Sequence, residues 1–106
     1  MKIGIIQGTS QIDKNSILYE CTKEYGEVTN FGCFENEENY SYVEIALEIC
    51  LLISSQAVDF IVTGCSSGQG MMIACNSLPN LICGYLPTPQ DAYLFGRIND
   101  GNVASL

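Results

Sequence analysis

The chain has 106 residues, which is the size of a single domain. Apolar residues make up 47% of it and charged residues 15%, which excludes a disordered chain. Four basic residues against twelve acidic ones give a formal charge of -8, so we expect binding neither to nucleic acid nor to an anionic membrane surface. The sequence contains no histidine, which excludes Ser-His and Cys-His dyads and most catalytic zinc sites within the chain.

The six cysteines are spread along the sequence, and no two have the spacing of a C-x-x-C pair. The apolar run in residues 1–6 is too short for the core of a signal peptide, and no stretch is long enough to span a membrane. These features predict a cytoplasmic protein whose thiols are free.

Short apolar runs alternate with longer segments of helical periodicity along the whole chain. In chain order the predicted elements are strand 2–6, helix 13–25, strand 27–31, helix 40–55, strand 58–62, helix 67–76, strand 81–86, helix 88–98 and strand 103–106. This alternation predicts an α/β protein with three layers, a Rossmann-like (flavodoxin-like) fold around a five-stranded parallel sheet. We expect a single domain over residues 1–106. Since the chain stops inside a strand-like run, we also expect it to lack a C-terminal helical segment of the natural protein.

Ligands of such folds bind in the loops that follow the carboxyl ends of the strands. In this sequence the candidate loops are 7–11, 32–37, 64–70, 87–91 and any residues after Leu106. Within the first loop we assign Gly8 and Thr9 to the substrate site, because the Thr9 hydroxyl could donate to a phosphate. A helix-capping role for Thr9 remains an equal alternative.

The loop that joins the third strand to the third helix is the most informative segment. Gly68 and Gly70 would let the backbone approach a ligand closely, and the N–H groups at the start of the helix favour an anion. A thiol in that position has a lowered pKa, so Cys65 could act as a base or nucleophile without a histidine. Ser66 and Ser67 could donate to a developing oxyanion. The alternative is a glycine-rich turn that contains a buried cysteine.

Several segments of the chain resemble the family of ribose-5-phosphate isomerase B and the galactose-6-phosphate isomerase subunits. Residues 65–76, CSSGQGMMIACN, are similar to the family pattern C-G-T-G-x-G-M-x-x-A-A-N-K. Residues 99–103, NDGNV, are similar to its N-D-A-N-V. The opening residues 1–5 and the segment 29–32 resemble the first strand and the end of the second strand, so the resemblance covers essentially the whole chain.

The resemblance implies a metal-independent isomerase without a cofactor, which interconverts aldose and ketose phosphates through an enediol(ate). It implies that Cys65 is the general base and that Ser67, in place of the family's threonine, donates a hydroxyl near the reacting oxygens. The backbone of Ser66, Gly68, Gln69 and Gly70 is implied to hold the enediolate. The resemblance also implies that Asn99 contacts the substrate and that a homodimer shares the site across its interface.

The sequence departs from the family pattern at residues that handle the sugar ring and the phosphate. The family's Asp-His pair after the first strand falls on Gly8 and Thr9, and the ring-opening histidine falls on Ile98. Another sugar or another anionic group therefore stays open as the substrate. We predict a sugar-phosphate isomerase of carbohydrate metabolism; the alternative is a non-catalytic sugar-phosphate or nucleotide binding module on the same fold.

Overall fold

The computed structural model describes residues 1–34 and 40–106. Every strand and helix that the sequence predicts is present, with shifted boundaries. The elements are β1 (Lys2–Ile6), α1 (Ile12–Thr22), β2 (Glu27–Gly32), α2 (Tyr42–Ser54), β3 (Phe60–Thr63), α3 (Gln69–Asn76), β4 (Cys83–Tyr85), α4 (Pro89–Leu94) and β5 (Val103–Ser105). A short 3-10 helix, Thr9–Gln11, precedes α1, and a π-helical segment, Phe95–Asn99, follows α4.

The five strands form one parallel sheet in the order β2-β1-β3-β5-β4. The predicted α/β fold with a five-stranded parallel sheet is therefore confirmed. The last two strands are exchanged relative to the 2-1-3-4-5 order of flavodoxin. The order reverses between β1 and β3, which is where such folds place their ligands.

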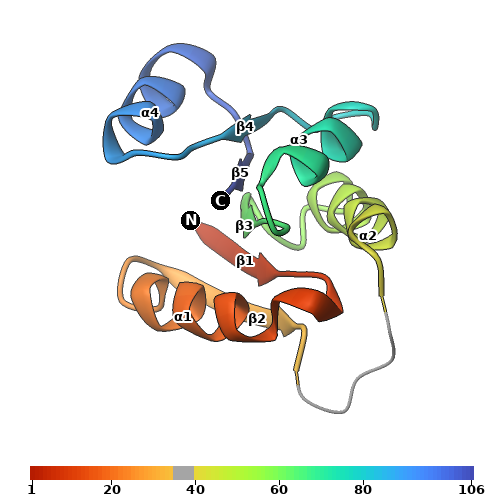
Figure 1. Cartoon of the computed structure of the whole chain (residues 1–106). Coiled ribbons are helices and arrows are strands. Elements are labelled where there is room, and N and C mark those ends of the chain that lie inside the picture. The colour runs from red at the N-terminus through yellow and green to blue at the C-terminus, as the bar shows by residue number, and fades with distance from the viewer. Residues whose placement is uncertain (35–39) are drawn as a thin grey trace.

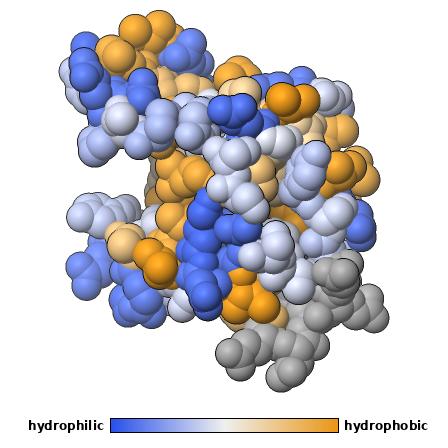
Figure 2. Space-filling view, viewed as in Figure 1, coloured by the Kyte–Doolittle hydropathy of each residue, from blue (hydrophilic) through white to orange (hydrophobic). Residues whose placement is uncertain are grey.

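Helices α2 and α3 lie side by side and cover one face of the sheet (Figure 1). Between them and the sheet is an apolar core that includes Ile6, Ile49, Ile61, Met71 and Val103. The opposite face is covered by α1 over β1 and β2, and by the ring of Phe95, which lies against Gly84 of β4. Apolar surface gathers in the indentation between the α1 and α4 ends of the molecule (Figure 2).

Helical spacing in the sequence predicts one apolar stripe on each of α1 and α2. On α2 the stripe contains Ala46, Leu47 and Leu51 and is widened by Ile45 and Ile49; the structure buries only part of it. In α2 the buried side chains are Ile45, Ala46 and Ile49, whereas Leu47 and Leu51, expected to face the core, are more than half exposed. Both stripes of this helix are apolar, so spacing alone could not decide between them.

In α1 the expected apolar stripe is not the buried one either. Ile17 and Cys21 are exposed and Tyr25, 81% exposed, lies beyond the end of the helix. The buried residue is Asn15, whose Nδ2 donates to Asn30 Oδ1 at 2.9 Å and to the Cys33 carbonyl at 3.3 Å. Polar contacts therefore orient α1 on the sheet.

The predicted helix 88–98 is divided in the structure. Its α-helical part ends at Leu94, and the wider π-helical turn that follows contains Phe95. This turn presents the Phe95 ring to Gly84, where an added Cβ would lie 2.7 Å from the ring. None of the helices in residues 1–34 and 40–106 has the length and apolar character needed to cross a bilayer.

Two apolar residues of α2 differ strongly in exposure and allow the packing of the core to be tested. Ile49 is 0% exposed and Leu51 is 70% exposed. We expect Ile49→Ala to lower the free energy of unfolding by about 2–5 kcal/mol, because it leaves a cavity between α2 and the sheet. Leu51→Ala is the matched control and should change it by no more than about 0.5 kcal/mol. Urea unfolding followed by circular dichroism measures both; equal losses would contradict the burial described here.

Candidate functional site

A cavity of about 360 Å³ lies where the loops after β1 and β3 meet the start of α2. It is lined by Gly8, Ser10, Gln11, Tyr40, Ser41, Tyr42, Gly64, Cys65, Ser66 and Ser67. The structure thus brings together four residues that the sequence predicted for the site: Gly8, Cys65, Ser66 and Ser67. An apolar groove of about 370 Å³ lies between α2 and α3; Tyr42 lines both it and the cavity, and the predicted site residue Gly70 lines the groove.

The loop after β3 surrounds the Cys65 sulfur with backbone donors. Partial burial raises the pKa of the Cys65 thiol. Hydrogen bonds from four backbone N–H groups lower the pKa by more, those of Met71, Ser67, Gly68 and Gly70. The pKa of Cys65 is consequently below its ordinary value, because the loop stabilises the thiolate.

Glycine is required at the turn that makes this arrangement. Gly68 has a φ of +79°, in the left-handed region, and a Cβ there would lie 2.8 Å from the Tyr85 ring. Its carbonyl accepts a hydrogen bond of 2.5 Å from the hydroxyl of Ser105, at the end of β5. Gln69 donates its N–H to the Ser67 hydroxyl oxygen at 3.3 Å, which leaves the Ser67 proton available to a ligand. Gly68, Gln69 and Gly70 therefore contribute backbone rather than walls of the cavity.

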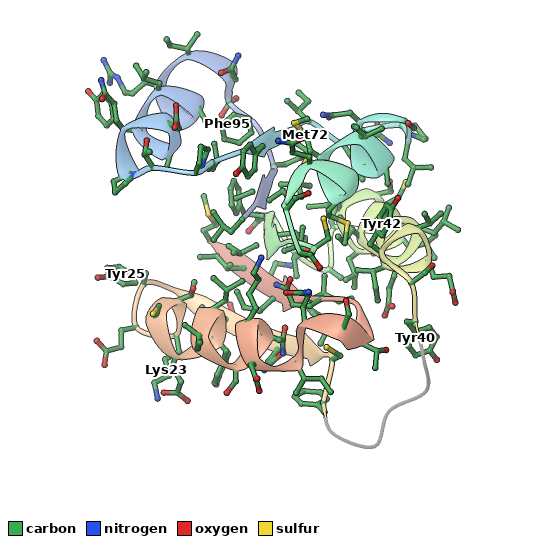
Figure 3. The ribbon with its side chains drawn as sticks, viewed as in Figure 1. Lys23, Tyr25, Tyr40, Tyr42, Met72 and Phe95 are labelled. Carbon is green, nitrogen blue, oxygen red and sulfur yellow. The ribbon has the colours of Figure 1, made fainter. Side chains whose placement is uncertain are left out.

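Thr9 lies beside the cavity and does not line it. Its N–H donates to the Tyr40 carbonyl at 3.2 Å, and its hydroxyl accepts from the Tyr40 N–H at 2.8 Å. These two hydrogen bonds fix Tyr40 at the rim of the cavity, and the contact of Thr9 with a substrate stays a prediction. Tyr40 and Tyr42 project from the segment that enters α2 (Figure 3), and the Tyr42 ring packs against Gly70 of the Cys65 loop.

Asn99 is not brought to the cavity within one chain. It ends the π-helical segment that leads into the amino end of β5. Thr63 of β3 is in register with Ser105 at the other end of β5, and Cys65 follows Thr63. Because the two strands are parallel, Asn99 lies toward the amino ends of the strands and Cys65 toward their carboxyl ends.

Two residues that the sequence analysis did not select reach the loop from the start of α1. Gln11 donates its Nε2 to the Ser66 hydroxyl oxygen at 3.2 Å. Lys14 donates its Nζ to the carbonyl of Cys65 and to that of Leu106, at 2.7 Å each. The sequence did carry a signal for these two residues, because Gln11 and Lys14 stand at the start of a helix that directly follows a candidate ligand loop.

In the part of the chain that the structure describes, no three His, Cys, Asp or Glu side chains are grouped so that they could hold a metal ion. The polar groups that line the cavity are one thiol, serine hydroxyls, tyrosine rings and a glutamine amide. Together with the loop N–H groups, these can bind a small polar anion and move a proton.

Residues 3–106 match the family model described as Ribose/Galactose Isomerase. The chain belongs to this isomerase family. Among curated proteins, none matches the sequence.

Solved structures of other members are similar over the whole chain. One is a 4-deoxy-L-threo-5-hexosulose-uronate ketol-isomerase complexed with a tartrate, 44% identical with a TM-score of 0.93. Another is a ribose-5-phosphate isomerase from Vibrio parahaemolyticus, 40% identical with a TM-score of 0.91. In both cases the match covers 100% of this chain and 53% of the other. A ribose-5-phosphate isomerase B from Clostridium thermocellum is 27% identical with a TM-score of 0.86, over 98% of this chain and 70% of that one.

The lowered pKa of Cys65 predicts the pH at which its thiol reacts. Iodoacetamide should modify Cys65 with a pH midpoint below that of the same cysteine in the urea-unfolded protein, because only the folded loop offers the sulfur its N–H groups. Peptide mass spectrometry after timed alkylation at several pH values measures both midpoints. Coincident midpoints would contradict the proposed stabilisation of the thiolate.

Proposed function

We propose that this protein interconverts the aldose and ketose forms of a small anionic sugar, with Cys65 as the general base. The observation that carries the proposal is a thiol of lowered pKa in an amide-lined loop, beside a cavity of about 360 Å³. Membership in a family of sugar isomerases supports the reaction class. Neither a metal nor a cofactor is needed in this proposal, because backbone amides and hydroxyls take up the developing charge.

In the proposed mechanism the Cys65 thiolate removes the proton from the carbon next to the substrate carbonyl. The C–H electron pair forms the enediol double bond, and the negative charge moves to the carbonyl oxygen. The Ser67 hydroxyl donates to that oxygen, and the loop N–H groups that stabilised the thiolate also stabilise the enediolate. The Cys65 thiol then gives the proton to the former carbonyl carbon. The proton of the neighbouring hydroxyl passes by way of Ser67 to the oxygen that carried the charge, so the carbonyl forms one carbon along without net gain or loss of a proton.

The substrate class that we propose is a sugar phosphate, with a sugar uronate as the second candidate. A ribose-5-phosphate isomerase is 40% identical to this chain, whereas the 44% identical relative is named for a uronate. The two classes share a short carbon chain, a carbonyl and one anionic end.

We propose a homodimer in which each site combines residues of both subunits. Asn99 lies toward the sheet edge opposite Cys65, so a second copy is the direct way to bring an asparagine of this kind to the cavity. The apolar surface between α1 and α4 supports a second subunit that covers this face, since parallel sheets are ordinarily buried on both faces (Figure 2). A reducing cytoplasm is the proposed compartment, because the base must remain a free thiol.

A first experiment tests the base. Wild-type protein is incubated in heavy water with ribose 5-phosphate, galactose 6-phosphate and 4-deoxy-L-threo-5-hexosulose uronate, and deuterium uptake is followed by proton NMR. We expect uptake at the carbon next to the carbonyl of one compound, and a loss of about 10²–10⁴-fold in Cys65→Ala. Cys21→Ala, at an exposed cysteine of α1, is the matched control and should retain full activity.

Full activity in Cys65→Ala would rule out Cys65 as the base. An absence of uptake with every compound, together with a thermal stabilisation by one of them that survives in Cys65→Ala, would favour the binding module.

A second experiment tests the shared site. Cys65→Ala and Asn99→Ala proteins, each weakly active alone, are unfolded in urea, mixed in equal amounts and refolded. Half of the dimers are then mixed and have one intact site of two, so about a quarter of the wild-type activity should return. Refolding each variant separately before mixing is the control. No gain on co-refolding would place Asn99 outside the partner's site.

A further inference from the structure

Lys14 joins three parts of the candidate site through one ammonium group. It lies in the first turn of α1, directly after the β1 loop, and is partly buried. Its Nζ donates to the carbonyl of Cys65, two residues beyond β3, and to the carbonyl of Leu106, just beyond β5. The ends of three parallel strands are thus held together at one point.

The neighbouring backbone is shaped to admit this ammonium. A Cβ at Gly64 would lie 3.3 Å from the Lys14 Nζ and would also collide with the Leu106 carbonyl group. Glycine at position 64 therefore leaves the space in which Lys14 bridges the two carbonyls. Conformational freedom is not the reason here, because Gly64 is not among the glycines with a positive φ.

The start of α1 departs from the usual preferences of a helix N-terminus. Asp13 in the first turn suits the helix dipole, but the positive charge of Lys14 next to it opposes the dipole, which favours anions there. Gln11 occupies the N-cap and makes no side-chain capping bond; its amide donates to Ser66 instead. Both departures are explained by the same loop, since Lys14 and Gln11 each bind to it.

We infer that Lys14 is a positioning residue, which holds the Cys65 loop in the conformation whose N–H groups converge on the sulfur. This inference rests on the proposed function of Cys65. The ammonium fixes the Cys65 carbonyl on the α1 side, and the peptides that follow then turn their N–H groups to the thiolate. Without the ammonium, the carbonyls of Cys65 and Leu106 lose their donor, and nothing then fixes the orientation of the Cys65 peptide.

The groups around the loop are few. Lys14 faces it from α1, Tyr40 and Tyr42 face the cavity from the start of α2, and Tyr85 of β4 lies against Gly68. Among the described residues, the hydrogen bonds place no other cationic side chain on residues 64–70. A change in the behaviour of Cys65 on substitution of Lys14 is therefore traceable to the loss of the two hydrogen bonds that its ammonium makes.

The test compares Lys14→Met, Lys14→Arg and Lys23→Met. Lys23 follows the other end of α1, where it is exposed and pairs with Glu20, so its substitution is the matched control. In Lys14→Met we expect a higher pH midpoint for the alkylation of Cys65 and about a tenfold slower alkylation at pH 7. The kcat of deuterium exchange should fall at least about tenfold with KM within about threefold, and arginine should restore most of both.

The control Lys23→Met should leave all these quantities within about twofold of the wild type. An unchanged midpoint for Cys65 in a folded Lys14→Met protein would overturn the inference. So would a raised KM with an unchanged kcat, which would make Lys14 a substrate ligand. If the methionine variant fails to fold, Lys14→Gln takes its place, since its shorter amide keeps a donor but cannot bridge both carbonyls. Alkylation needs no substrate, so it decides the role of Lys14 even if the isomerase proposal fails.

Discussion

Because the five strands are parallel, their carboxyl ends meet at one edge of the sheet, and the strand-end loops of the candidate site begin there. The same topology directs the N-termini of the helices that follow β1 and β3 to that edge. Strand carbonyls and helix N–H groups therefore face each other across short loops. Lys14 binds the carbonyls and the loop N–H groups bind the Cys65 sulfur, so a thiolate is stabilised without a histidine.

The strand and helix pattern was predictable because runs of buried β residues and helical periodicity alternate along the chain. The orientation of two helices was not. Helix α2 has apolar residues on more than one side, and the sheet buries the side that carries Ile49. Helix α1 buries Asn15, whose Nδ2 donates to Asn30 of β2 and to the carbonyl of Cys33 just after β2. Such cross-element polar contacts are not visible in a single sequence.

The residues of the candidate site were likewise predictable only in part. The position of Cys65, its glycines and its serines could be predicted, because they occupy one continuous loop after a buried strand. Gln11, Lys14 and Tyr42 could not, since their contacts depend on how two helices lie over the sheet. Asn99 was predicted from resemblance alone, and the same resemblance implied a site shared across a dimer interface, which no pattern within one sequence could show.

Charge explains why a neighbour would matter. The chain carries a formal charge of -8, and the Lys14 ammonium at the Cys65 loop is already bound to two carbonyls. In the proposed reaction, one subunit would therefore stabilise the reacting anion with fixed dipoles, which suit a charge that passes from sulfur to oxygen with little rearrangement. A distal anionic group of the substrate needs a cation of its own. Arg97 lies two residues before Asn99, so a subunit arrangement that delivers the partner's Asn99 also delivers the single arginine of the chain to the same region.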